Sequence, residues 1–177
     1  MVALSGPQAT EKALVAAVPG RHVVHIAAHG IADHRFGNQF GALVLSPPPQ
    51  GKETPDDDGF LSLHEIYALK LDKCDLAVLS ACVTNVGPQP PLEAGVTLAG
   101  GFLAAGARRV VASHWGVDDE ATAELMSAFF QEVTAAKTGG PVAYAQALKD
   151  ARLHVRNRTG WTAPYYWAPF VLIGPAD

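Results

Sequence analysis

The feature that most constrains the fold of this chain is a series of short, almost wholly apolar runs, separated by stretches with helical periodicity. Runs of this kind are typical of strands that are buried on both faces of a parallel sheet. Because helices alternate with these strands, the sequence predicts an α/β layer fold around a mostly parallel central sheet. The predicted strands are residues 22–28, 42–46, 75–81, 109–113 and 168–173, and the predicted helices are residues 8–18, 62–69, 92–105, 118–136 and 141–156.

The composition is that of one globular domain. Of the 177 residues, 49% are apolar and 17% are charged, so the chain can bury a sizeable core and is unlike a disordered protein. We predict a single domain over residues 1–177, which can itself be the catalytic part of a longer protein. The formal net charge is −4 and no basic stripe is present, which argues against direct binding of nucleic acid.

The distribution of apolar residues also bears on location. No apolar run approaches the ~20 residues that a membrane-spanning helix needs. The first residues lack the basic and then apolar order of a signal peptide. We therefore expect a cytoplasmic protein that makes no contact with a membrane.

Local signals set several element boundaries. Ser62 followed by Glu65 fits a capping box at the start of a short helix. Gly106 is placed to end the helix of residues 92–105. Asp118 and Asp119 stand at the start of the long helix, where the helix dipole favours negative charge. Pro141 is predicted to begin the last long helix.

The two cysteines, Cys74 and Cys82, flank the same predicted strand. Two cysteines are too few for a disulfide-stapled secreted domain. Eight residues of extended chain span roughly 26 Å, which excludes a disulfide between them if that strand forms. Cys74, at the beginning of the strand, is interpreted as an ordinary buried thiol.

Reactive residues follow two of the predicted strands. His29 and Gly30 come directly after the first strand, and Cys82 comes directly after the central one. If these strands are parallel neighbours, the imidazole and the thiol emerge at the same edge of the sheet. A thiol beside an imidazole is a nucleophile with its base, and the backbone N–H of Gly30 could approach a substrate oxyanion closely.

The sequence resembles the CHAT domain family of caspase-like cysteine peptidases, which are related to separase. The segments HIAAHG, LSAC, AGARRVVASHWGVDDEAT, AYAQALKDARL and YYWAPFVLIG carry this resemblance, which extends from about residue 9 to residue 174. It implies a caspase-like three-layer sandwich and a cysteine endopeptidase without a cofactor. It also implies His29 as general base, Cys82 as nucleophile, and the amides of Gly30 and Cys82 as the oxyanion hole. The expected partners are a protein or peptide substrate and a regulatory repeat domain or partner protein.

The segment from Trp115 to Asp119 is similar to a stretch of separase in which an acidic residue contacts a basic side chain at P1, the substrate residue before the cleaved bond. By this resemblance Asp119 would favour Arg or Lys at P1. Asp118, Trp115 and Ser113 are the accompanying candidates for substrate binding. The alternative interpretation is that Asp118 and Asp119 only cap the helix that they begin.

The sequence is also compatible with other functions. Cys82 could be a buried structural thiol, and the domain a non-catalytic scaffold or sensor module. It could also be a peptidase that stays silent until a partner orders the loops of residues 83–91 and 50–59. His25 and His29 lie too far apart on a strand to share a metal, and no phosphate-binding loop surrounds Lys52. We expect neither a metal nor a cofactor.

Overall fold

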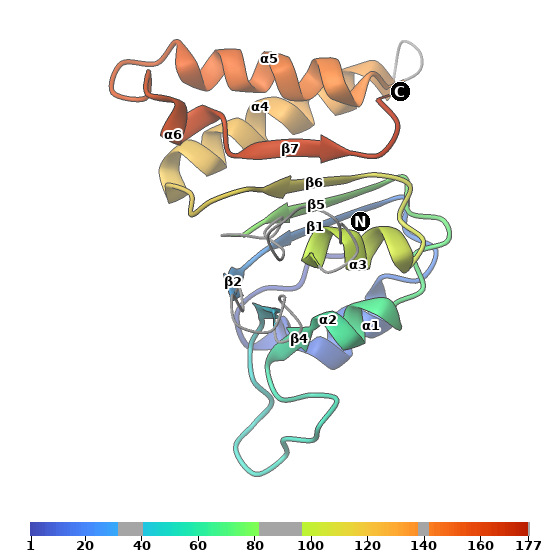
Figure 1. Cartoon of the computed structure of the whole chain (residues 1–177). Helices are drawn as coiled ribbons and strands as arrows, with labels where there is room; N and C mark the ends of the chain where they lie inside the picture. The colour runs from blue at the N-terminus through green and yellow to red at the C-terminus, as the bar shows by residue number, and fades with distance from the viewer. Residues whose placement is uncertain (32–40, 82–96, 138–141, 177) are drawn as a thin grey trace.

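A computed structural model describes residues 1–31, 41–81, 97–137 and 142–176. Its main sheet has four strands in the order β1-β5-β6-β7 (Figure 1). The first three strands are parallel, and β7 runs antiparallel to β6. The bounds are β1 Val23–Ala27, β5 Leu76–Ser80, β6 Val110–Ser113 and β7 Phe170–Ile173. The mostly parallel α/β sheet predicted from the apolar runs is confirmed.

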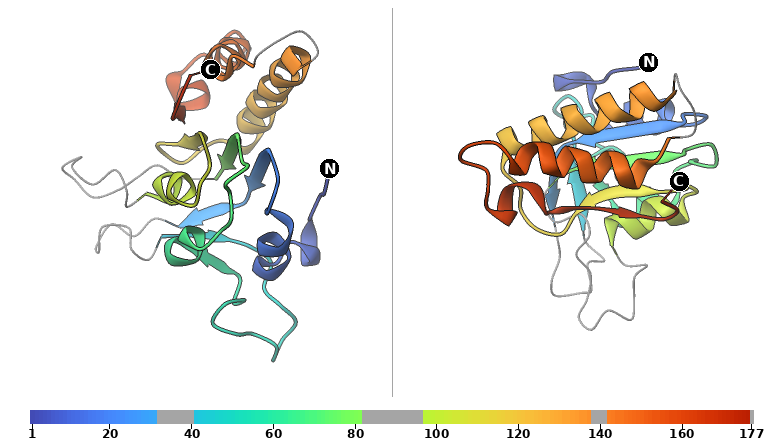
Figure 2. Two further views of the ribbon diagram at one scale, coloured as in Figure 1. Left: turned by 90° about the vertical axis from the view of Figure 1, so that its right-hand side faces the viewer. Right: turned by 90° about the horizontal axis from the view of Figure 1, so that it is seen from above.

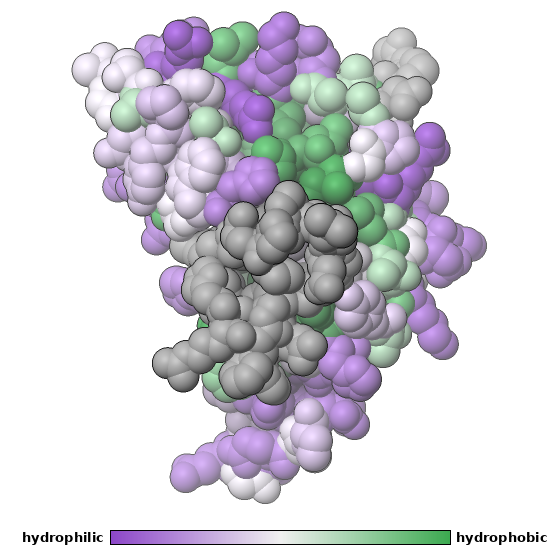
Figure 3. Space-filling model, in the orientation of Figure 1, coloured by the Kyte–Doolittle hydropathy of each residue, from purple (hydrophilic) through white to green (hydrophobic). Residues whose placement is uncertain are grey.

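Helices cover both faces of this sheet, which gives three layers (Figures 1 and 2). One face carries α4 (Asp119–Lys137), α5 (Tyr144–Arg156) and α6 (Pro164–Trp167). The other face carries η1 (Gly6–Gln8), α1 (Glu11–Ala17), α2 (Leu63–Tyr67) and α3 (Leu98–Ala104). Hydrophilic residues dominate the surface over α5 and over the loop of residues 50–59 at the bottom of the molecule (Figure 3).

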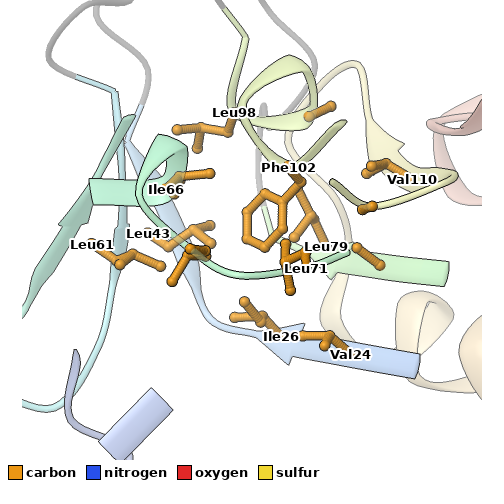
Figure 4. Close-up of a cluster of buried hydrophobic side chains, with 14 of the residues drawn as sticks. Val24, Ile26, Leu43, Leu61, Ile66, Leu71, Leu79, Leu98, Phe102 and Val110 are labelled. Atoms are coloured by element: carbon orange, nitrogen blue, oxygen red, sulfur yellow. The ribbon is translucent and has the colours of Figure 1, made fainter. Parts of the chain in front are cut away.

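Each face of the sheet has its own apolar core, because successive side chains of a strand point to opposite faces. Val24, Ile26 and Leu79 pack with Phe102 of α3 in the first core (Figure 4). The second core joins the opposite side chains of β5, β6 and β7 to α4 and α5, with Phe129 fully buried. This two-sided burial explains why the strands of the main sheet appear in the sequence as apolar runs rather than as alternating patterns.

A second, smaller sheet was not predicted as such. It consists of the antiparallel strands β2 (His29–Ile31), β3 (Ala42–Val44) and β4 (Phe60–Ser62). Only Ala28 separates β1 from β2, so the apolar run that predicted one strand passes directly into the second sheet. Within residues 42–46, only the first three form a strand.

Several helix ends confirm the local signals. Ser62 and Glu65 form the capping box, with the Ser62 backbone N–H donating to Glu65 Oε2 at 2.8 Å. Gly106 has a φ of +109° after α3, and the next residue, Ala107, donates its N–H to Phe102 O at 3.0 Å. A Cβ atom at Gly106 would lie 2.9 Å from the backbone nitrogen of Asp72, so both conformation and space require glycine here.

Other boundaries differ from the prediction. The last long helix begins at Tyr144 rather than at Pro141, which itself lies outside the described residues. The first helix begins at Glu11, because the Thr10 side chain accepts the N–H of Ala13 and so caps it. Likewise Thr97 caps α3, whose predicted beginning at residue 92 falls in an undescribed range.

Candidate active site

The register of the two central strands sets the geometry of the candidate site. β1 and β5 are parallel, and Ala27 lies opposite Ser80. His29 follows Ala27 by two residues, and Cys82 follows Ser80 by two residues. The two strands that precede the candidate catalytic residues therefore end at the same edge of the sheet. His29 is exposed at the start of β2, whereas Cys82 lies outside the described residues.

A groove of about 1550 Å³ runs from this edge along β1 and α4. Its lining includes His29, Ala81, which directly precedes Cys82, and Asp119, the first residue of α4. Three segments that are far apart in the sequence thus border one concave space, as ligand sites of open α/β sheets commonly do at the carboxyl ends of strands. The groove is large enough for several residues of an extended peptide.

The two aspartates at the start of α4 have different surroundings. Asp118 caps the helix, because its Oδ1 accepts the N–H of Ala121 at 2.9 Å. Asp119 is exposed and lines the groove that contains His29. The capping interpretation is therefore correct for Asp118, while the carboxylate of Asp119 is accessible to a ligand in the groove.

Gly30 directly follows His29, and Ser113 contacts Ala81, the residue before Cys82 in the sequence. Gly30 is the second residue of β2, opposite Leu43 of β3. Ser113 is fully buried at the end of β6, and its hydroxyl donates to the carbonyl oxygen of Ala81 at 2.5 Å. Ser113 thus holds the residue that precedes Cys82 from inside the protein, where a bound substrate would not reach it.

A family model of the CHAT domain matches residues 1–175. The chain belongs to the CHAT domain family. Its α/β fold, with the mostly parallel four-strand sheet flanked by helices, is consistent with the caspase-like fold of that family. No curated protein matches the chain.

Trp115 of this CHAT domain lies away from the groove. Its Nε1 donates to the carbonyl oxygen of Tyr165 at 3.4 Å, and its ring stacks on that of His114. It is 37% exposed and is not among the described residues that line the groove. Of the four candidates for substrate binding, Asp119 is the one that the described structure places in the groove with His29.

The sequence does not predict the contacts of His25. Its Nε2 shares a hydrogen bond of 2.8 Å with the Ser80 hydroxyl, and its ring centroid lies 5.1 Å from that of Phe130. The groove walls desolvate the ring and so lower the pKa of His25. His25 therefore connects β1 to β5 near the ends of both strands. The signal available in the sequence was its position two residues before Ala27, because residues two apart on a strand lie on the same face.

Two further observations concern metal binding and membrane spans in the CHAT domain. Among the described residues, no cluster of three or more histidine, cysteine, aspartate or glutamate side chains could hold a metal ion. In the same part of the chain, no helix is both long and apolar enough to span a membrane.

Proposed function

We propose that this CHAT domain is a cysteine endopeptidase that uses Cys82 as nucleophile and His29 as general base. The observation that supports this most strongly is the parallel register of β1 and β5, the strands that end just before His29 and Cys82 in the sequence. The groove beside His29 and Ala81 supplies the space for a peptide. Membership of a family with a caspase-like fold agrees with this chemistry.

The proposed reaction proceeds through a covalent acyl-enzyme. His29 accepts the proton of the Cys82 thiol, and the sulfur forms a bond to the peptide carbonyl carbon. The backbone amides of Gly30 and Cys82 donate to the resulting oxyanion. As the C–N bond breaks, the protonated His29 gives its proton to the leaving amine. Water, deprotonated by His29, then attacks the thioester, which releases the acid product and the free thiol.

Alkylation with a peptide electrophile tests this proposal directly. Cys74 is 2% exposed, and its burial raises the pKa of its thiol, so little reactive thiolate forms there at neutral pH. We expect rapid labelling of Cys82 and almost none of Cys74, as measured by peptide mass spectrometry. Equally slow labelling of both cysteines would contradict the peptidase and favour a non-catalytic scaffold. Rapid labelling only after addition of a partner would identify an enzyme that the partner activates.

We further propose that Asp119 gives the groove its preference for Arg or Lys at P1. The substitution Asp119→Asn removes the charge and keeps the shape, so kcat/KM for basic P1 substrates should fall roughly tenfold relative to neutral ones. Asp118→Asn is the matched control, because asparagine still caps the helix and Asp118 is not among the described residues that line the groove. If both substitutions change the P1 preference equally, Asp119 has no specific role. Cleavage of a P1 library measures the difference.

The amino-acid composition bears on the cellular compartment in which the enzyme acts. Low cysteine content suits a reducing compartment, and we propose that the enzyme acts on protein substrates in the cytoplasm. Its regulator would be a repeat domain or a separate partner protein.

A further inference from the structure

Among the described residues, the first strand of the main sheet has one unpaired edge. β1 is the terminal strand in the order β1-β5-β6-β7, so β5 is its sole neighbour in the part of this sheet that the structure describes. The N–H of Leu76 donates to the carbonyl oxygen of His22 at 3.1 Å, which fixes the alternation of backbone groups along β1. The backbone N–H and C=O groups of Val24 and Ile26 therefore face β5. The backbone groups of the intervening residues, Val23, His25 and Ala27, face outward and have no hydrogen-bond partner in the described part of the chain.

These outward groups open into a narrow space, which we name the β1 edge slot. Its volume is about 420 Å³, and all five residues of β1 form one side of it. The segment Met1–Leu4 also lines it, as do Leu14 and Val18 of α1. In both views of Figure 2 the N-terminal segment lies on the β1 side of the sheet. No hydrogen bond joins Met1–Leu4 to β1 among the described residues.

The shape of the slot determines what can occupy it. Met1–Leu4 and α1 line the slot together with β1, and the outward backbone groups of β1 are spaced to pair with one extended chain. Apolar side chains lie on both sides of the sheet plane at this edge. Leu14, Val18 and Leu45 belong to the slot, and Met126 and Phe130 of α4 belong to the adjoining groove.

We propose that the β1 edge slot binds an extended segment of a partner polypeptide, which becomes a fifth strand of the sheet. Its backbone would hydrogen-bond to Val23, His25 and Ala27, as in other cases of strand addition to an exposed sheet edge. Because both of its faces would meet apolar side chains, the segment should carry consecutive apolar residues without proline. This inference does not depend on the proposed peptidase activity.

The slot adjoins the groove of the candidate active site. Leu4, His25, Ala27 and Leu45 line both spaces. A strand bound at β1 would therefore lie beside the groove that contains His29, and the partner that donates it would be held next to the candidate catalytic residues.

Binding of a synthetic peptide tests the proposal. The probe is a fluorescent, terminally blocked Lys-Val-Ile-Val-Ile-Val-Lys peptide, added to the Cys82→Ala protein so that cleavage cannot interfere. Two isomers of this peptide carry N-methyl groups on alternate residues, one set for each edge of the extended chain. We expect saturable binding of the parent peptide and of one isomer, with the other isomer at least about tenfold weaker. No binding up to about 1 mM, or equal affinity of the two isomers, would overturn the proposal.

Amide exchange locates the bound strand. In the free protein, the amides of Val23, His25 and Ala27 should exchange rapidly, whereas those of Val24 and Ile26 should be protected by β5. Addition of the peptide should protect the three outward amides. If they are already protected in the free protein, another segment of this chain fills the slot and the proposal is wrong.

A pair of substitutions in α1 provides the matched control. Ala17 lines the slot, whereas its neighbour Ala16 is exposed and is not among the described residues that line it. Ala17→Trp fills the space and should weaken peptide binding at least about tenfold, whereas Ala16→Trp should leave it unchanged. Equal effects of the two substitutions would place the peptide elsewhere. Labelling of Cys82 in proteins with the native cysteine reports separately on the proposed peptidase.

Discussion

Replacement of Cys82 by alanine should lower kcat/KM for peptide cleavage by about 10⁴-fold or more. The alanine side chain cannot form the thioester, so the proposed route through an acyl-enzyme is closed. His29→Ala should cause a loss of similar size, because the thiol then lacks the base that activates it and the acid that protonates the leaving amine. The double variant should be little worse than either single one, since residues that act as a unit give non-additive effects. Steady-state cleavage of a fluorogenic peptide measures all three losses.

Cys74→Ala is the control for this experiment. Cys74 is buried just before β5, at the opposite end of that strand from Cys82. Its substitution should retain full activity and cost about 1 kcal/mol in the free energy of unfolding, as expected for a small buried truncation. Circular dichroism of each variant shows whether the fold is kept. Full activity of a folded Cys82→Ala protein would refute the mechanism.

The main sheet could be predicted from the sequence because its strands are buried on both faces. Such burial leaves a continuous apolar run, and the runs that became β1, β5 and β6 were located to within one or two residues. Their parallel order followed from the helices between them. The family was also recognisable, because the segments around His29 and Cys82 and the segment after β6 are specific in combination.

The small sheet and the exact helix starts could not be predicted in the same way. The three-residue strands β2 and β4 form because β3 pairs with both, and no local sequence pattern indicates that pairing. The short helix α6 was missed because its four residues leave no periodicity to detect. Helix starts depend on single side chains such as Thr10 and Thr97.

The candidate site could be predicted only in part. The sequence places His29 and Cys82 after parallel strands, and the register of β1 and β5 agrees with that placement. Equivalent residue types nevertheless have different roles in three dimensions. Asp118 caps α4 while its neighbour Asp119 lines the groove, and Ser113 turns inward to Ala81. The sequence alone does not determine which of two adjacent polar side chains faces a cavity.

Glu11→Ala should lower the free energy of unfolding by about 2–4 kcal/mol. Glu11 is 1% exposed in the first turn of α1, and its Oε2 accepts the N–H groups of Asp58 and Gly59, each at 2.6 Å. Alanine would leave both donors without this acceptor and remove a well-packed side chain. The Gly59 carbonyl in turn accepts the N–H of Leu45, which lines the groove, so the loss also loosens one groove wall. Urea denaturation measures the change.

Glu120→Ala is the matched control, because Glu120 stands in the first turn of α4 but is exposed. Its loss should change the free energy of unfolding by less than about 0.5 kcal/mol. Equal effects of the two substitutions would mean that Glu11 acts only through the helix dipole. Its hydrogen bonds to the loop would then contribute nothing measurable.

The stability that Glu11 provides should also depend on pH, in a direction opposite to that of an exposed ion pair. Burial raises the pKa of Glu11 above its usual 4.5, so the folded protein binds this proton more tightly than the unfolded chain does. This contribution is complete below pH 4.5 and is lost as the pH rises through the raised value. Glu11→Gln keeps an acceptor for the two N–H groups but cannot ionise. The stability of the wild type relative to Glu11→Gln should therefore decrease from pH 4 to pH 7, and an increase over that range would show that the buried carboxylate favours its charged form.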